Sequence, residues 1–427
     1  MENKLSFIQE TYKSIFIIFL ISMYGIAREN SMVMLLVAIL LLFIELRTNK
    51  NNVFYWSFFL IPNIRFLDTT SVKFLVNFLM VIPIVKYTIC YDFFRKRFLG
   101  ILFGLALFLF EVLHIVYFET YDTLFPTIAW GLSFSLCIMA STDKSIAINK
   151  GDIYDSLSVG IIFSSLLYLI AEPKSVFTNY YNFTERFIAY ADDPNYFSLY
   201  ILYCLSTWIL IDKKKYRFGT FAIVAFIGFL TSSKMEFILS SLIFIYIAID
   251  FFRKNNVKGI IKKLPLILFV LIIFVSYKIE TILDYCAHIL TRMGGVGASI
   301  DTITTGRFHL QMYYLNDFVE SFSDYILGFG FTYFRFLGEP SVRGAHNTYI
   351  DILVAWGIIG SIFFFMIIYL WVLKSKRVYI QNKHLKSSAY FPIIIFCLVL
   401  CSLSCFSANM FPFMLMAVFP FLNKNRN

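Results

Sequence analysis

The sequence predicts an all-α integral membrane protein, a polytopic bundle of about 11 to 14 transmembrane helices with one long, partly helical extracytoplasmic loop. Composition is the first observation: 59% of the 427 residues are hydrophobic and 15% are charged, whereas a soluble domain is about half apolar and a quarter charged. The second is that apolar runs of about 15 to 20 residues recur, each long enough to cross a bilayer as a helix. The strict alternation of a barrel strand is absent, so these runs are expected to be helices whose backbone polar groups pair internally.

Basic residues punctuate the apolar runs and predict their orientation. By the positive-inside rule such clusters face the cytoplasm, so an even number of spans should separate neighbouring clusters. The net charge of +10 therefore reflects the basic clusters that orient the spans, and no nucleic acid partner is expected. The clusters are Arg47–Lys50, Arg95–Arg97, Lys144–Lys150, Lys213–Arg217, Arg253–Lys263, Lys374–Lys386 and Lys424–Arg426.

The spans that satisfy this orientation are spread over the whole chain. The third contains Pro62 and Arg65 and is expected to be re-entrant or broken. The expected spans are residues 12–27, 31–46, 54–68, 71–90, 98–117, 124–141, 153–171, 194–211, 218–231, 235–252, 264–279, 346–373, 389–405 and 408–422.

The chain divides into an N-terminal transmembrane bundle (residues 1–279, including an outer loop at 172–193), a long extracytoplasmic loop (280–345) and C-terminal transmembrane helices (346–427). A loop of about 65 residues without structure would be unusual. Apolar residues in its middle recur with helical spacing, which predicts a helix that lies on the membrane surface or caps the bundle. These are Phe308, Met312, Leu315, Val319 and Phe322.

Cationic side chains in the outer segments are unexpected under the positive-inside rule. Arg186 lies in the shorter outer loop, Arg307, Arg335 and Arg343 lie in the long one, and Lys234 falls at the outer end of a helical hairpin. A guanidinium offers a planar fork of donors that matches phosphate oxygens two at a time, so such groups could hold a lipid diphosphate. Alternatively, each arginine pairs with a loop carboxylate such as Asp301, Asp317 or Glu339.

Two other polar sites in the outer segments each allow two interpretations. His346, next to Asn347 at the outer mouth of a span, could accept a proton from a hydroxyl or could serve as a helix cap. Asp192 and Asp193 could bind a divalent cation or could mark the turn into the following span.

Glu111 lies inside an expected span, where a charged carboxylate would be costly. It could pair with His114 across a helical turn or face a cleft. The sequence does not decide between these two arrangements.

Residues Arg343–Gly360 read RGAHNTYIDILVAWGIIG, in which His346 and Asn347 are followed by nine residues and then Gly357. This spacing resembles the O-antigen polymerase and ligase family, integral-membrane glycosyltransferases that act on undecaprenyl-diphosphate-linked oligosaccharides. Ligases of that family usually end the motif with a threonine, where this chain has Gly360.

Shorter motifs extend the resemblance over residues 186–360. Gly306–Arg307 is similar to the family's GR pair, although the tryptophan expected shortly after it is missing, and Leu327–Gly330 is similar to its "fGxG" turn. Arg186 with Asp193–Asn195 resembles the family's Arg and "pN" motif. Ser232–Lys234 resembles its "SR" hairpin with lysine in place of arginine, which puts bidentate phosphate binding there in doubt.

The resemblance implies a polymerase that joins undecaprenyl-diphosphate-linked repeat units into surface polysaccharide by a metal-independent, inverting transfer without a cofactor. Arg307 and Arg186 would hold the leaving diphosphate, and His346 would orient or deprotonate the acceptor hydroxyl. The residues expected to bind substrate are Lys234, Arg343, Asn347, Arg335 and Asn195.

The expected partners are the lipid-linked glycan donor and acceptor and the lipid bilayer of the bacterial inner membrane, with the active site facing the periplasm. Whether a separate protein that regulates chain length also binds is left open by the sequence. A ligase that transfers the glycan to a lipid A core is the nearest alternative. A lipid-linked glycan flippase or transporter is a second one, although the chain has neither an internal repeat nor many charges inside its spans, as transporters commonly have.

Overall fold

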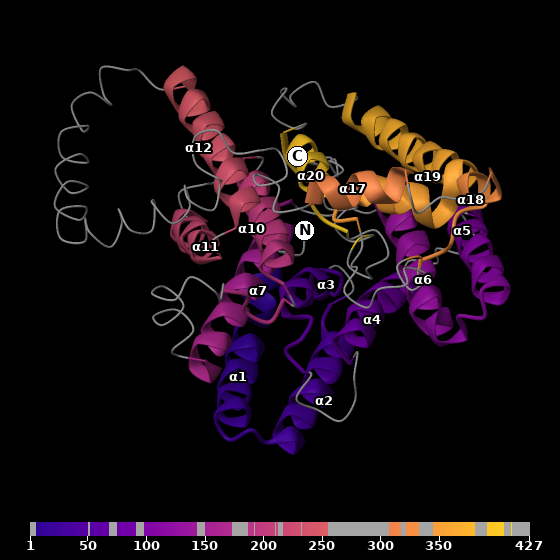
Figure 1. Cartoon of the computed structure of the whole chain (residues 1–427). Helices are drawn as coiled ribbons and strands as arrows, with labels where there is room; N and C mark the ends of the chain where they lie inside the picture. Colours follow the sequence, from indigo (N-terminus) through magenta and orange to yellow (C-terminus); the bar gives the residue numbers. More distant parts are fainter. Residues whose placement is uncertain are drawn as a thin grey trace.

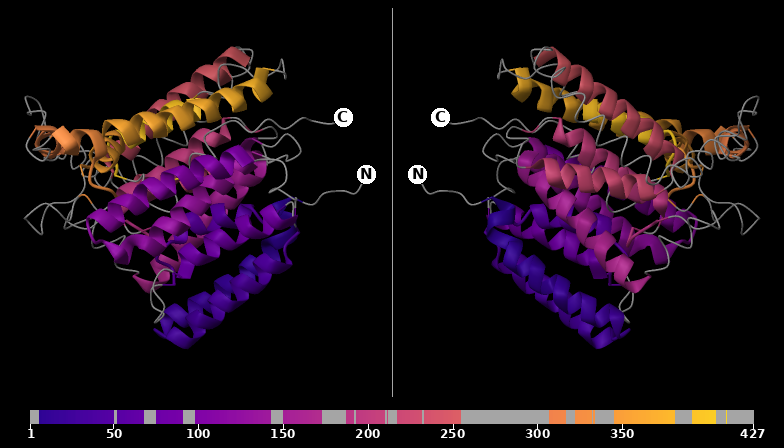
Figure 2. Two further views of the ribbon diagram at one scale, coloured as in Figure 1. Left: turned by 90° about the vertical axis from the view of Figure 1, so that its right-hand side faces the viewer. Right: turned by 90° about the vertical axis from the view of Figure 1, so that its left-hand side faces the viewer.

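The computed structural model is helical over the residues it describes, with no strand among them. Its long helices run broadly along one direction, and α17 and α18 lie at one end of the stack (Figures 1 and 2). The described residues are 6–49, 52–67, 75–90, 98–142, 150–172, 187–191, 193–209, 211, 217–231, 233–254, 307–316, 322–331, 333, 345–380, 391–404 and 411.

The first half of the chain contributes α1 (Phe7–Ala27), α2 (Ser31–Arg47), α3 (Tyr55–Leu60), α4 (Leu75–Cys90), α5 (Phe98–Tyr117), α6 (Leu124–Thr142) and α7 (Lys150–Ala171). The rest of the chain contributes α10 (Pro194–Trp208), α11 (Phe218–Leu230), α12 (Lys234–Lys254), α17 (Arg307–Asn316), α18 (Phe322–Leu327), α19 (Thr348–Ile380) and α20 (Phe391–Leu400). Short 3₁₀ turns cover Ile61–Asn63 and Tyr121–Thr123.

Side-chain caps fix the first helical hairpin. At the start of α1 the Ser6 hydroxyl accepts from the Gln9 amide at 3.4 Å while the Gln9 side chain accepts from the Ser6 amide at 3.0 Å, which is a capping box. Asn30 begins α2 by accepting from the amides of Met32 and Val33, both at 3.1 Å.

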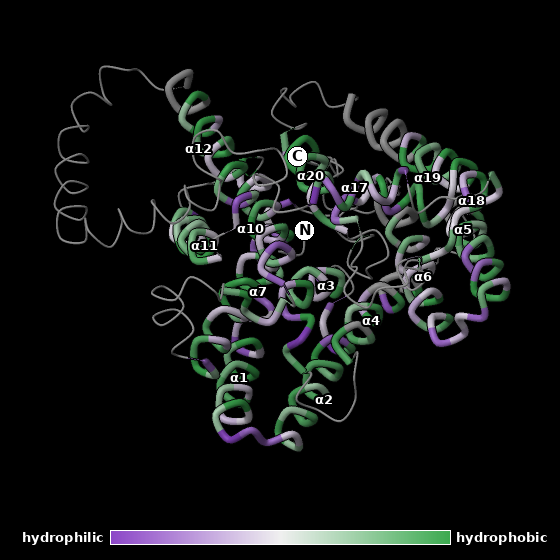
Figure 3. Tube along the Cα trace, in the orientation of Figure 1, coloured by the Kyte–Doolittle hydropathy of each residue, from purple (hydrophilic) through white to green (hydrophobic). Residues whose placement is uncertain are grey.

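The described helices form two groups that are joined by α4, which packs against α2, α3 and α6. In the first, α7 packs against α1, α3 and α11, and α10 packs against α7, α11, α12 and α20. In the second, α5 pairs with α6, and both contact α19, which also packs against α17 and α18 (Figure 1). The helices are predominantly apolar, with hydrophilic stretches on α17 and near α10 (Figure 3).

The expected break in the third span is confirmed. Helix α3 ends at Leu60, and a 3₁₀ turn through Pro62 follows. The turn is held against α7 by two hydrogen bonds. The side-chain amide of Asn63 donates to the Gly160 carbonyl at 3.2 Å, and the Ser164 hydroxyl donates to the Pro62 carbonyl at 2.8 Å. A side chain at Gly160 would collide with the backbone of α3, so glycine permits this contact.

Within the part of the chain that the structure describes, three helices are long and apolar enough to cross a bilayer: Phe7–Ala27, Lys150–Ala171 and Thr348–Leu370. Gly104–Tyr117, Phe218–Leu230 and Phe391–Leu400 are shorter apolar helices. The expected span at 264–279, and that at 408–422 apart from Phe411, lie outside the described residues. The predicted number of crossings therefore stays a prediction.

The helix predicted in the long loop corresponds to two described helices, α17 and α18. Most of the described apolar residues that predicted it are exposed: Phe308 is 45% exposed and Phe322 is 80% exposed. Leu315 is partly buried, and Tyr314, which is not among the predicting residues, is fully buried. Val319 lies outside the described residues. An exposed apolar stripe fits the predicted position on a membrane surface better than a cap over the bundle.

Glycines at two places let the α18 turn insert into a kink of α19. Gly357 interrupts α19 with φ +59° and ψ −169°, and Gly328 and Gly330 follow α18 with φ +75° and +78°. The amides of Phe329 and Gly330 donate to the carbonyls of α19 just before the kink, at 3.1 and 2.7 Å. A side chain at Gly357 would collide with the end of α18, so glycine serves both the backbone conformation and the close approach.

Replacing Gly357 by alanine should destabilise the protein by about 1 to 3 kcal/mol, since this backbone conformation is nearly exclusive to glycine. Thermal unfolding in detergent would show a lower Tm. Gly219→Ala is the matched control, because nothing lies within 4 Å of the added methyl group in α11. Equal Tm values for the two variants would contradict this account of the kink.

Candidate functional site

Arg307 is the first residue of α17, and its guanidinium is fixed on one side. Its Nη1 donates to the carbonyl of Ser402 at 2.8 Å. Burial lowers the pKa of Arg307, and the negative charge of Asp193 raises it. Because arginine is not deprotonated in proteins, the group stays charged, and the structure holds this charge half-buried within the electrostatic influence of Asp193.

The non-helical Ser402–Ser404 segment, which follows α20, connects four helices. Its three carbonyl oxygens accept, in chain order, from Arg307 of α17, from the Thr348 hydroxyl of α19 and from the Tyr196 hydroxyl of α10. The hydroxyl of its first serine lies 2.8 Å from the Met235 sulfur in α12. Figure 1 shows α17 beside α19 and α20.

Hydrogen bonds of polar side chains join the start of α10 to the start of α12. The Asp193 carboxylate accepts from the Asn195 amide at 2.7 Å and so caps α10. The Asn195 side-chain oxygen then accepts from the Ser233 hydroxyl at 3.2 Å, immediately before Lys234 begins α12. The interpretation of Asp193 as part of a turn into a helix is thus confirmed, and Asp192 lies outside the described residues.

His346 adopts a left-handed backbone conformation with φ +51° just before α19. Such a conformation is uncommon for a residue other than glycine and costs about 1 to 3 kcal/mol unless its surroundings impose it. The cap of α19 is Asn347, whose side-chain oxygen accepts from the amides of Tyr349 at 3.0 Å and Ile350 at 3.4 Å. His346 is therefore not the residue that caps this helix.

The structure gathers several of the predicted site residues. Arg307 binds the Ser402–Ser404 segment directly, and the residues that follow Asn195 and Asn347 in the chain bind the same segment. Lys234 directly follows Ser233, whose hydroxyl donates to the Asn195 side chain. The predicted residues Arg186, Arg335 and Arg343 lie outside the described residues, as do the loop carboxylates proposed as arginine partners.

Glu111 has a role that the sequence did not indicate. Its carboxylate accepts from the Phe331 amide at 2.7 Å and from the Trp356 indole at 2.8 Å. His114, one turn later, instead contacts the Leu327 carbonyl at 2.8 Å. Neither of the two expected arrangements of Glu111 is the observed one: it fastens the turn after α18 to α5 and α19.

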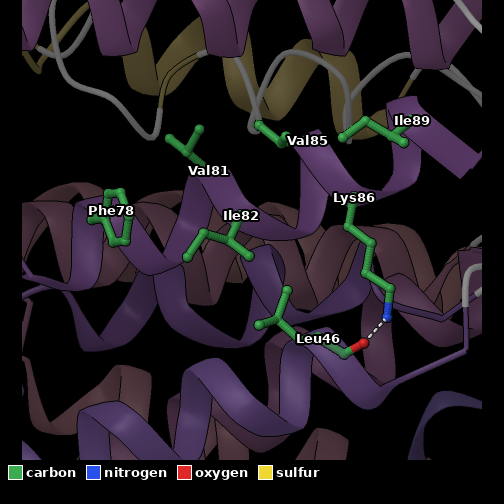
Figure 4. A pocket seen from close by; sticks show the side chains of 7 residues that line it. All are labelled: Leu46, Phe78, Val81, Ile82, Val85, Lys86 and Ile89. Atoms are coloured by element: carbon green, nitrogen blue, oxygen red, sulfur yellow. Dashed lines mark hydrogen bonds between the residues drawn. The ribbon is translucent and has the colours of Figure 1, made fainter.

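A hollow of about 390 Å³ between α2 and α4 has apolar walls and is separate from these residues (Figure 4). Among the described residues that line it, Lys86 alone is charged. Its amine donates to three carbonyls at the end of α2, those of Glu45, Leu46 and Thr48. The lysine thus completes the helix end, and the hollow contains none of the predicted site residues.

The isosteric change Glu111→Gln should lower stability by about 1 to 3 kcal/mol, because an amide N–H group would face a buried donor in place of a carboxylate oxygen. Thermal unfolding of the purified variant measures this. Glu119→Gln is the control, since Glu119 is exposed shortly after the same helix. A Tm for Glu111→Gln equal to that of the control would exclude the fastening role.

Comparison with known families matches residues 219–365 to the model described as O-antigen ligase. The match begins in α11 and ends in α19, so it includes Lys234, Arg307, His346 and the kink at Gly357. Curated proteins and solved structures give no match. Together with the three long apolar helices, the match indicates a membrane protein. The match supports the resemblance to the O-antigen polymerase and ligase family over residues 219–365.

Proposed function

We propose that this protein is a polymerase of the bacterial inner membrane that joins undecaprenyl-diphosphate-linked repeat units into surface polysaccharide at its periplasmic face. The observation that carries the proposal is the half-buried Arg307, held by one arm on the segment where α10, α17 and α19 meet. The family match supports membrane glycan transfer broadly.

The main electrostatic demand of this reaction is the negative charge of the departing diphosphate. A guanidinium that is already oriented and partly removed from water stabilises such charge without reorganising, and one such donor is worth about 3 to 4 kcal/mol in other enzymes. Arg307 supplies this group. Together with Arg186 it forms a diphosphate clamp, in which each guanidinium binds phosphate oxygens. Further positive charge comes from Lys234, Arg335 and Arg343. Since these side chains supply positive charge, the transfer needs no metal ion.

The transfer is a single displacement at the anomeric carbon of the donor. The acceptor hydroxyl oxygen forms the new glycosidic bond as the bond to the diphosphate oxygen breaks, which inverts the configuration. The hydroxyl proton passes to the His346 imidazole, since histidine is the side chain that most often serves as a general base in enzymes. Asn347 caps the start of α19 and so fixes the backbone next to the histidine.

The packing around Gly360 favours polymerase over ligase. A Cβ atom at this position would meet Phe110 Cε1 and Trp356 Cβ, each at 2.6 Å. The threonine found here in ligases of the family therefore has no room in this arrangement. A ligase that transfers glycan to a lipid A core or another acceptor is the second candidate, since the matched family model is described as O-antigen ligase.

A transporter of lipid-linked glycans receives no support from the family match. Purified protein in detergent, without any gradient and with a chelator present, should elongate lipid-linked repeat units. Elongation under these conditions excludes transport as the primary activity. Loss of elongation on chelation alone would overturn the metal-independent mechanism.

Deleting the gene should leave surface lipid that is capped by a single repeat unit, because the first unit is still transferred when polymerisation stops. Gel profiles of extracted surface glycan distinguish this outcome. Uncapped lipid core in the deletion strain would instead identify the protein as the ligase.

Arg307→Ala in that deletion background should lower chain elongation roughly a hundredfold, the typical cost of removing a donor to developing negative charge. Arg307→Lys should recover part of it, since a lysine restores the charge without the fork. Arg28→Ala is the matched control, because Arg28 is exposed between α1 and α2. An unchanged amount and length of glycan in Arg307→Ala would refute the clamp.

A further inference from the structure

The backbone that precedes His346 is held by two buried side chains, neither of which is among the residues that define the family motifs. The Asp351 carboxylate, one turn into α19, accepts from the Ala345 amide at 3.1 Å. The same oxygen accepts from the Tyr333 hydroxyl. The Tyr333 hydroxyl also lies 3.3 Å from the Ala345 amide, so Tyr333, Asp351 and Ala345 form a closed triangle of polar contacts.

All three members of this triangle are buried. Asp351 is 1% exposed, Tyr333 is 3% exposed and Ala345 is fully buried. Burial and the nearby Asp351 raise the pKa of Tyr333, so its hydroxyl keeps its proton and donates to the carboxylate. An edge contact between the rings of Tyr314 and Tyr333, with centroids 5.5 Å apart, ties the triangle to α17, the helix that begins with Arg307.

From this juxtaposition we infer that Asp351 and Tyr333 are positioning residues that impose the left-handed conformation of His346 and thereby set the direction of its imidazole. Ala345 is the residue immediately before His346, and Asn347 is fixed on the other side as the cap of α19. With both neighbours held, the backbone of His346 has little freedom to relax. The direction of its Cα–Cβ bond follows from that backbone.

This inference rests on the proposed role of His346 as the group that accepts the acceptor's proton. It assigns Asp351 no charge-based role: the carboxylate acts as a hydrogen-bond acceptor. The distinction matters because an acceptor role survives replacement by asparagine, whereas a role in proton transfer or charge stabilisation does not.

The test compares Asp351→Leu and Asp351→Asn, two replacements of similar size, in the purified full chain with a lipid-linked repeat unit as substrate. Asp351→Leu removes the acceptor, and kcat should fall by as much as about a hundredfold while the KM for the donor stays nearly unchanged. Asp351→Asn keeps an oxygen that accepts from Ala345 and Tyr333, and should retain most of kcat. A comparable loss in both variants, or a loss expressed in KM, would overturn the inference.

Tyr333→Phe is the milder variant in case Asp351→Leu does not fold. It removes one hydroxyl and leaves the contact between Asp351 and Ala345, so a smaller fall in kcat and a smaller loss of Tm than in Asp351→Leu are expected. Tyr325→Phe in α18, where the tyrosine is 42% exposed, is the matched control and should behave as the wild type. Wild-type kcat in Tyr333→Phe would overturn the role of Tyr333.

His346→Ala separates the failure of this inference from the failure of the proposed function. If His346→Ala keeps full activity, the assignment of His346 is wrong and the proposed function loses its base. If His346→Ala loses activity but Asp351→Leu does not, the inference alone is wrong. Where residual activity can be measured in His346→Ala, adding Asp351→Leu should lower it no further, since both changes remove the same contribution.

Discussion

The hydrogen bond from Arg307 to the carbonyl of Ser402 is the contact on which the account of the site depends. An arginine that is half removed from water must direct its donors at acceptors, because an unpaired buried charge is costly. One arm is satisfied by the backbone, and Asp193 lies near enough for its charge to favour the ionised guanidinium. This leaves a cation with a fixed orientation at the start of α17.

The part of the long loop that the structure describes is anchored on the bundle at several places. Its α17 begins at Arg307, beside the Ser402–Ser404 segment, while the turn after α18 inserts at the kink of α19 and is fastened by Glu111. The segment before α19 is held by Asp351. These contacts bring residues from distant parts of the sequence to one end of the bundle, as the proposed glycan transfer requires.

Much of the helical framework could be predicted from the sequence, since apolar runs and basic clusters mark helices and their ends. The break at Pro62 and the turn at Asp193 were predictable because proline and capping residues act locally. The Ser402–Ser404 segment was not, because it acts mainly through backbone carbonyls, which every residue has. Glu111 was recognisable as unusual within an apolar span, but its partner Phe331 is 220 residues away and no local pattern indicates it.

Binding of the leaving group tests the central claim most directly, because it isolates the clamp from catalysis. Undecaprenyl diphosphate should bind the purified wild-type protein, and Arg307→Gln should weaken that binding at least tenfold, since a hydrogen bond to a charged group contributes about 1.5 to 3 kcal/mol. The exposed-site variant Arg28→Gln should bind as the wild type does. An unchanged Kd in Arg307→Gln would contradict the account.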